Sequence, residues 1–259
     1  MKTCVFCGKS SQQVQITKEH ILPKWMKNVF PHDKHFSYSS NYTGKKSVRR
    51  EIKGITSFDM VVSQVCKDCN NGWMSAKLEG PLKEVLTKLV LSENIILDQS
   101  TLKLLCLWAF KTSIVRALID NGETNIPSEY YAKAAKLEIP EGCSVYIADR
   151  GWDNDFYYTR YTTLRMHDKP GFICAIEIRA LVFFVICSDY PTTKAYLNDA
   201  CEKIYQPQNV VKIWPPCPSS VMMDPTASTL TWPLENKLPL PSTHFADVVL
   251  RERYGRSPE

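Results

Sequence analysis

Two cysteine pairs carry the residue types best suited to metal chemistry in this chain. Each pair has the pattern Cys-x-x-Cys: Cys4 with Cys7, and Cys66 with Cys69. Structural zinc prefers four Cys or His ligands in a tetrahedron, supplied as two short-spaced pairs from separate segments. Such a site leaves no coordination position open, so it supports the fold and does no chemistry. The spacing therefore predicts a structural Zn²⁺ site.

A second candidate site lies at Glu19 and His20, in the segment between the two pairs. A carboxylate can bind a hard divalent cation through oxygen, while an imidazole with a pKa near neutrality can take a proton from water. Asn70 directly follows the second pair and offers a carbonyl oxygen to the same ion. We expect Mg²⁺ or Mn²⁺ here, although a lone histidine is more often a surface or core residue.

Charge is distributed unevenly along the chain. Residues 1–90 contain 15 Lys and Arg against 7 Asp and Glu, a balance of +8, and residues 91–259 contain 17 against 20, a balance of −3. A basic N-terminal third favours a polyanionic partner. The candidate nucleic-acid contacts flank the Glu-His motif or lie in a basic hairpin arm: Lys18, Lys24, Lys27, Lys45, Lys46, Arg49 and Arg50. The alternative is a solvated charged surface.

Hydrophobic periodicity predicts an α+β fold in two domains. Strands are expected near 13–16, 36–42, 47–55 and 58–65, with a helix from about Asn70 that Pro81 breaks or kinks. Ser92 to Gln99 has the composition of a connection, which puts a domain boundary near residue 95. The second domain, 96–259, is expected to begin with helices at 101–120 and 127–136. Four strands between 144 and 187, a helix at 194–205 and a strand at 210–214 should follow, before a Pro-rich tail without periodicity.

The chain contains no long apolar segment. No run approaches the roughly 18 apolar residues that a membrane helix requires, and the N-terminus lacks the apolar core of a signal peptide. We therefore expect a cytoplasmic protein, and in a reducing compartment the ten cysteines are not a disulfide framework.

The order Cys-x-x-Cys, Glu-His-Ile-x-Pro, Cys-x-x-Cys-Asn resembles the zinc-supported branch of the HNH endonuclease superfamily, whose core is the ββα-metal fold. The resemblance covers about residues 1–80. It implies that Glu19 and Asn70 bind the catalytic Mg²⁺, that His20 is the general base and that the cysteines hold zinc. It also implies DNA as the substrate, with RNA possible, and it is compatible with restriction, phage defence or mobile-element biology.

One position departs from the family pattern. A middle Asn is expected a few residues before the second cysteine pair, where this chain has Asp59 and no Asn. Asn71 would replace Asn70 if the register were one residue off, and Glu79 is expected to face solvent. The departure favours an alternative function: a zinc module that binds nucleic acid without cutting it. A third interpretation, in which the C-terminal domain binds a nucleotide signal, has no phosphate-binding motif behind it.

Overall fold

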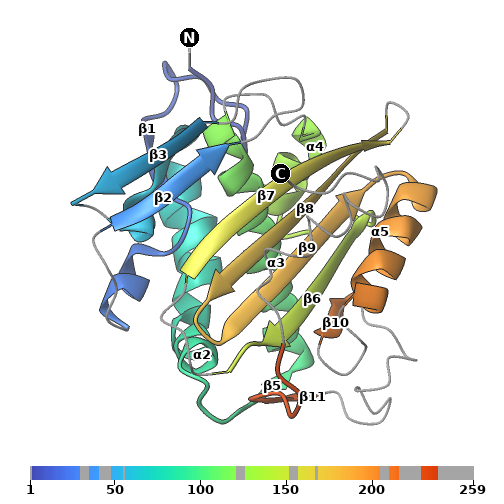
Figure 1. Cartoon of the computed structure of the whole chain (residues 1–259). Coiled ribbons are helices and arrows are strands. Elements are labelled where there is room, and N and C mark those ends of the chain that lie inside the picture. Colours follow the sequence, from blue (N-terminus) through green and yellow to red (C-terminus); the bar gives the residue numbers. More distant parts are fainter. Residues whose placement is uncertain are drawn as a thin grey trace.

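The computed structural model describes residues 2–29, 35–40, 48–54, 56–120, 126–151, 157–166, 169–204, 210–215 and 229–238. Helices and strands both contribute, which agrees with the mixed α+β class that the sequence predicts. Figure 1 shows a large sheet with helices on its two faces, and a smaller group of N-terminal elements beside it.

The second half of the chain is built on an antiparallel sheet with the strand order β10-β6-β9-β8-β7. Its strands are β6 (Cys143–Asp149), β7 (Tyr157–Met166), β8 (Lys169–Ile178), β9 (Leu181–Ser188) and β10 (Val210–Trp214). Every residue of β6 and β9 is buried. Strands buried on both faces are continuous apolar runs, and this explains the composition of the stretch from Ala180 to Cys187.

Each face of this sheet is covered by a different helix. Alternate residues such as Ile147 and Phe183 belong to the main hydrophobic core, and Phe183 lies against Trp108 of α3 (Gln99–Ala117), with ring centroids 5.8 Å apart. The residues between them, such as Phe184, form a second cluster that packs against Tyr196 of α5 (Pro191–Ile204). The sheet therefore separates α3 from α5 (Figure 1).

Helix α3 is the central element of the fold. Asp98 caps its N-terminus by accepting a hydrogen bond from the backbone N–H of Thr101 at 2.7 Å. All residues from Leu105 to Ala117 are buried, and the helix contacts the sheet, α2 (Gly80–Val90) and α4 (Ser128–Ala135). A helix that is buried on all sides is a core helix of a large domain. Its buried set includes two cations, Lys111 and Arg116.

The N-terminal elements form a two-stranded sheet followed by a helical segment. β1 (Ile16–His20) pairs antiparallel with β4 (Val61–Cys66), so that Glu19 lies opposite Val62 and His20 opposite Val61. The chain then runs without interruption through α1 (Lys67–Cys69), the π-helix η3 (Asn70–Glu79) and α2. Both cysteine pairs and the Glu-His motif are therefore close to one strand pair and one helix start.

The segment between β1 and β4 is folded. It contains η1 (Lys24–Asn28), the hairpin strands β2 (His35–Ser40) and β3 (Val48–Lys53), and η2 (Ser57–Asp59). β2 and β3 pair antiparallel from His35–Lys53 to Ser40–Val48, which confirms the predicted hairpin strands. The turns η1 and η2 contact each other below the end of β1.

The structure differs from two local expectations, a helix break at Pro81 and a connection around residue 95. Pro81 does not break the helix, because the helix changes type there: the π-helix ends with Gly80 N–H bonded to Ser75 O, and Pro81 falls in the first turn of α2. Pro81 has no N–H to donate, and it directly follows the last π-type bond, so the missing donor falls where the hydrogen-bonding pattern changes. The stretch around residue 95 is the strand β5 (Ile95–Asp98), which pairs with β11 (Thr229–Trp232) from the Pro-rich tail.

One hydrophobic core joins the N-terminal elements to the second half. It includes Leu22 and Val65 from before residue 95 together with Trp108 and Val185 from after it. Contacts therefore cross residue 95 at many points. Within the described ranges, no helix is long and apolar enough to cross a membrane.

Candidate functional site

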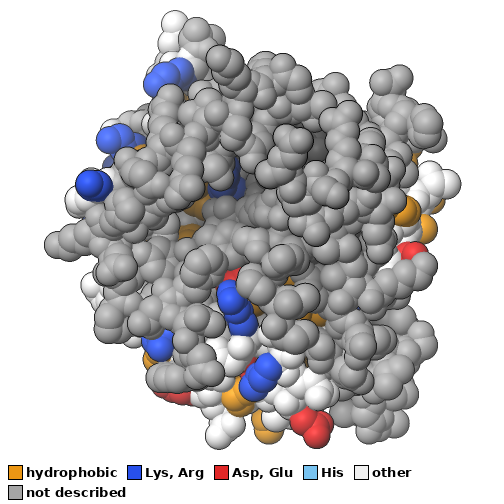
Figure 2. Space-filling view, viewed as in Figure 1, with side chains coloured by type: hydrophobic (Ala, Val, Ile, Leu, Met, Phe, Trp, Pro, Cys, Tyr) orange, Lys and Arg blue, Asp and Glu red, His pale blue; other side chains and the backbone are white. Residues whose placement is uncertain are grey.

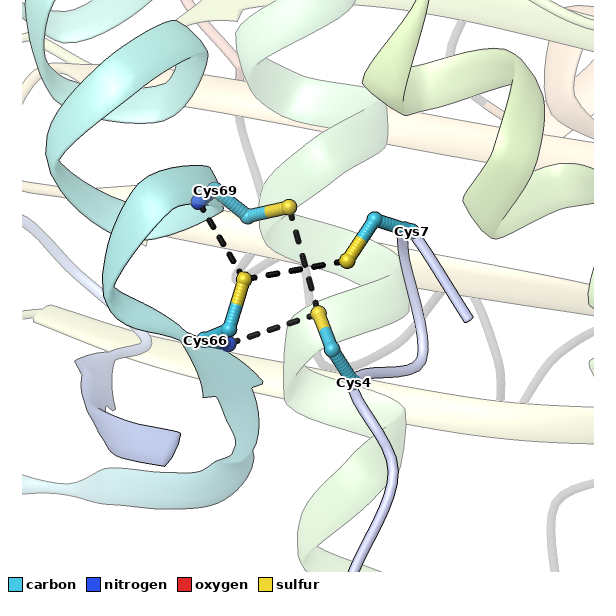
Figure 3. A group of neighbouring side chains, drawn as sticks. All are labelled: Cys4, Cys7, Cys66 and Cys69. Carbon is cyan, nitrogen blue, oxygen red and sulfur yellow. Dashed lines mark hydrogen bonds between the residues drawn. The ribbon is translucent and has the colours of Figure 1, made fainter. Parts of the chain in front are cut away.

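The four cysteines of the two pairs converge on one point (Figure 3). Their Sγ atoms all lie within 4.8 Å of one another, with Cys4 to Cys69 at 3.9 Å and Cys7 to Cys66 at 3.7 Å. Zinc bound tetrahedrally at about 2.3 Å from each sulfur would set the sulfurs about 3.8 Å apart. The cluster therefore has the size and composition of a site for a metal ion such as zinc.

The backbone around the cluster points N–H groups at the sulfurs. Cys66 N–H donates to Cys4 Sγ at 3.3 Å, and Cys69 N–H donates to Cys66 Sγ at 3.5 Å. The first pair makes a tight turn in which Gly8 N–H bonds to Cys4 O and Gly8 has φ +73°. This is a left-handed conformation that favours glycine. Two local turns thus aim their thiols at a common centre.

The thiols of the cluster have unequal proton affinities. Burial raises the pKa of Cys69, and the nearby Cys4 raises it further. Burial also raises the pKa of Cys66. For Cys4 burial acts in the same direction, but hydrogen bonds from the backbone of Cys7 and Cys66 outweigh it and lower its pKa. Since thiolates are the ligands of zinc, metal binding at this cluster would release protons.

Aromatic packing fixes the first cysteine turn on the rest of the molecule. The ring of Phe6 lies edge-on to Trp73 of η3 and to Tyr131 of α4, with centroids 5.3 Å apart in both cases. Cys4, Cys66 and Cys69 are buried and Cys7 is exposed. A metal at this cluster would therefore join the N-terminal turn to the start of the long helix.

Glu19 lies at the other end of β1 and is paired with a lysine from the second half of the chain. Glu19 is 5% exposed, and its Oε1 accepts a hydrogen bond from Lys111 Nζ at 3.1 Å. The same Nζ donates to Glu79 Oε1 at 2.7 Å. Burial raises the pKa of Glu19, against the opposing effect of Lys111. Burial lowers the pKa of Lys111, but the two carboxylates together outweigh it and raise that pKa above its usual range. Two carboxylates thus share one buried ammonium.

The π-helix explains how Glu79 reaches this position. Glu79 is nine positions after Asn70. In an α-helix nine positions make about two and a half turns, which would put the two residues on opposite faces. With i→i+5 bonding a turn holds more than four residues, so nine residues make about two turns. Asn70 and Glu79 therefore lie on the same side of η3, toward β1. The expectation of a solvent-facing Glu79 is wrong, since its side chain is 17% exposed.

His20 is half-buried at the end of β1. Its pKa is lowered below 6.5, first by burial and then by the positive charge of Lys24, while Asp59 and Glu79 act in the opposite direction. The imidazole is therefore neutral at pH 7. A neutral imidazole can accept a proton, which is what a general base requires.

Asp59 occupies the place where the family pattern has an Asn, and it organises the turn beside His20. It accepts hydrogen bonds from Thr56 N–H and from the Thr56 hydroxyl, and pairs with Lys27 Nζ at 2.5 Å. The hydrogen bond from Lys27 is the largest of the effects that lower its pKa to about 2. The turn in turn supports β1 through a bond from Ile21 N–H to Met60 O at 3.1 Å. Asp59 is a positioning residue for this loop.

Asn70 connects the helix start to β1. Its Nδ2 donates to Lys18 O at 3.0 Å and to Thr17 Oγ1 at 3.3 Å. The side chain thus bonds the backbone beside Glu19. Asn70 therefore bonds the helix start to the middle of β1, whereas Glu19 and His20 lie at the end of the strand that pairs with Val61 and Val62.

These contacts do not fit a divalent cation held by Glu19 and Asn70. The Glu19 carboxylate is buried and already neutralised in part by Lys111, and the Asn70 amide is bonded to the strand. Among the described residues, no group of three or more His, Cys, Asp or Glu side chains at this end of β1 could hold a metal ion. The predicted Mg²⁺ or Mn²⁺ role therefore remains a prediction that the geometry does not support.

The predicted nucleic-acid contacts are described in part. Lys18 and Lys24 are exposed, and Lys27 is tied to Asp59. In Figure 2 described Lys and Arg side chains lie at the upper left, where the N-terminal segment runs, and also near the lower centre of the view. The side chains of the other four predicted contacts lie outside the described part of the chain: Lys45, Lys46, Arg49 and Arg50. For Arg49 and Arg50 the backbone is described, as part of β3.

Lys111 is the site residue that the sequence does not predict. It lies in an apolar helix far along the chain, and only the fold brings it to Glu19. The signal for it is a single Lys between Phe110 and Thr112 in a run that is otherwise free of charge from Leu104 to Val115. A fully buried lysine needs a carboxylate partner, so this position predicts a buried acid elsewhere.

Comparison of the chain with protein-family models, with curated proteins and with solved structures found no match.

Proposed function

We propose that this protein hydrolyses phosphodiester bonds in nucleic acid, with His20 as the general base. The observation that carries the proposal is the strand β1: Glu19 and His20 lie at one end of it, and Asn70 bonds the helix that follows the second cysteine pair to Lys18 of the same strand. The arrangement of β1, β4 and the following helix supports the resemblance to the ββα-metal fold of HNH endonucleases.

The electrostatics around His20 support a base at neutral pH. Burial and Lys24 keep its imidazole neutral, so a proton can move from water to a ring nitrogen. The water oxygen would then attack phosphorus, the bond to the leaving oxygen would break, and solvent would protonate that oxygen. Lys24 is exposed beside His20, and its positive charge would stabilise the negative charge on the phosphate during attack.

The zinc cluster has a supporting part in this proposal. Cys4, Cys7, Cys66 and Cys69 would hold Zn²⁺, and a four-thiolate ion leaves no open position for substrate. Its contribution is to fix the helix start that carries Asn70 and, one π-helix later, Glu79. DNA is the proposed substrate, and RNA is the second polyanion to test, since the basic N-terminal third distinguishes neither.

The test is cleavage of supercoiled plasmid, single-stranded DNA and RNA by the zinc-loaded protein, with and without Mg²⁺ or Mn²⁺. We expect His20→Ala to reduce the rate by at least about a hundredfold. Lys103→Ala, which changes an exposed residue of α3, is the matched control and should leave the rate unchanged. Equal cleavage by His20→Ala and the unsubstituted protein would reject the proposal.

A second function, nucleic-acid binding without cleavage, is favoured by one observation. Glu19 is paired with Lys111 rather than open to an ion. A binding module of this kind would retain nucleic acid in a gel-shift assay, lose it as salt is raised, and give no cleaved product under any metal condition.

A further inference from the structure

The arrangement of Lys111, Glu19 and Glu79 has the form of a cation site. Its ligands come from β1 and from the end of η3, and both carboxylates contribute Oε1 to one position. What fills that position is the ammonium of Lys111, which is fully buried.

We propose that Lys111 is the resident cation of this site, taking the place between Glu19 and Glu79 that a divalent ion would otherwise occupy. As a statement about the reaction, this rests on the proposed function. As a statement about cation binding, it stands on the geometry of these three side chains.

Three features of the contacts favour a permanent ammonium. The Nζ lies within hydrogen-bond distance of both carboxylates, at 2.7 and 3.1 Å, and charge-assisted bonds of this kind are the strong ones. The lysine is carried by α3, whose surroundings are packed core on all sides, so it has no path to solvent without disrupting that core. A divalent ion entering beside it would meet an unscreened positive charge in a desolvated site.

The geometry also distinguishes this site from the cysteine cluster. The cluster offers four soft thiol ligands, whereas the Glu19 site has two hard oxygen ligands and already contains a positive charge. Added zinc and added Mn²⁺ should therefore behave differently: zinc goes to the cysteines, and Mn²⁺ finds no place at Glu19.

A consequence is that the site is completed by the second half of the chain. Glu19 and Glu79 precede residue 95, and Lys111 follows it. Without Lys111 the two carboxylates would lie within about 6 Å of each other in a largely buried position, where they would repel each other or attract a divalent ion.

The inference is tested by measuring Mn²⁺ binding to the full, zinc-loaded chain. Binding is detected as the loss of the electron paramagnetic resonance signal of free Mn²⁺. The variants are Glu19→Gln, Lys111→Met, and the two combined, with Glu84→Gln as a control that removes an exposed carboxylate of α2. We expect Glu19→Gln to change Mn²⁺ affinity by less than about twofold, like the control, because Glu19 is not a ligand when Lys111 is present.

In Lys111→Met we expect Mn²⁺ to bind at least about tenfold more tightly, and the added Glu19→Gln to abolish the gain. A tenfold or greater loss of affinity in Glu19→Gln alone would overturn the inference, since Glu19 would then bind the ion beside Lys111. A folded Lys111→Met protein without Glu19-dependent binding would overturn it as well. If Lys111→Met does not fold, the comparison of Glu19→Gln with the unsubstituted protein decides. The readout is binding, so a protein that cleaves nothing can still confirm the inference.

Discussion

Replacing Lys111 with Met should destabilise the protein through charge rather than through packing. Methionine has nearly the length of lysine, but it removes the ammonium that Glu19 and Glu79 share. The variant leaves one carboxylate almost fully buried and a second that is 17% exposed, both without their cation.

The magnitude follows from the burial of the group. Removing one partner of a buried ion pair costs about 3–5 kcal/mol, because the remaining charge is left uncompensated in a low-dielectric place. Lys111 is fully buried and serves two carboxylates, so the upper part of this range applies at pH 7. For a chain of this size that corresponds to a fall of roughly 10 °C or more in the midpoint of thermal unfolding.

The pH dependence of the deficit has a definite sign. In the Lys111→Met variant the pKa of Glu19 in the folded state should rise further, because its desolvation is no longer opposed by the lysine. When the pKa of a group is higher in the folded state than in the unfolded state, its contribution to the free energy of unfolding is lost as pH rises through the folded-state pKa. The difference between the variant and the unsubstituted protein should therefore shrink as pH is lowered toward the range in which carboxylates protonate.

The assay is urea unfolding of the zinc-loaded protein followed by circular dichroism, at pH 7 and at lower pH. Lys103→Met, an exposed lysine on the same helix, is the control and should change the free energy of unfolding by less than about 0.5 kcal/mol. Adding Glu19→Gln and Glu79→Gln to Lys111→Met should recover more than half of the loss. The reasoning is refuted if Lys111→Met is as stable as the control, or if neutralising both carboxylates recovers nothing.

Three further predictions concern the cysteines, His20 and Asn70. Cys7→Ser should lower zinc content, measured by atomic emission, and abolish cooperative thermal unfolding, whereas Cys174→Ala, away from the cluster, should keep one zinc per chain. The cleavage rate should reach half its maximum at a pH below 6.5 and become independent of pH once His20 is deprotonated, because the base is active in that form. Lys24→Met should move this midpoint to higher pH, since the charge of Lys24 lowers the pKa of His20. An unmoved midpoint would exclude His20 as the titrating group. Asn70→Asp should lower the free energy of unfolding by about 1–2 kcal/mol in urea, because both donors to β1 are lost, and a stability equal to that of the unsubstituted protein would contradict this.

The cysteine cluster was predictable from the sequence because its geometry depends mostly on residues close together in the chain. Two Cys-x-x-Cys turns each fix the direction of their own thiols, and only one tertiary step, the pairing of β1 with β4, is needed to bring the turns together. The same step brings the start of the helix beside β1, the strand that carries Glu19 and His20, and Asn70 bonds the two through Lys18 O.

The rest of the site depends on features that a local pattern does not contain. Glu79 is brought toward β1 by a change of helix type, and the sequence around Gly80 and Pro81 does not distinguish a π-helix from a kinked α-helix. Lys111 reaches Glu19 only because α3 is packed between the sheet and the N-terminal elements. The pairing of β5 with β11 likewise joins segments more than a hundred residues apart, and each strand alone has only four residues.

Departure from the family pattern at Asp59 has a structural explanation. Asp59 caps its own turn and pairs with Lys27, and the turn holds the end of β1. Asp59 therefore steadies the loop beside His20.

Chemical rescue of His20→Ala by added imidazole tests the central claim most directly. The claim is that His20 takes a proton from the attacking water, so a free imidazole entering the space left by the substitution should restore plasmid cleavage in proportion to the concentration of its neutral form. Rescue that follows the titration of imidazole would agree with the account. A His20→Ala protein that keeps its fold and its zinc and yet cleaves at the unsubstituted rate without imidazole would contradict it.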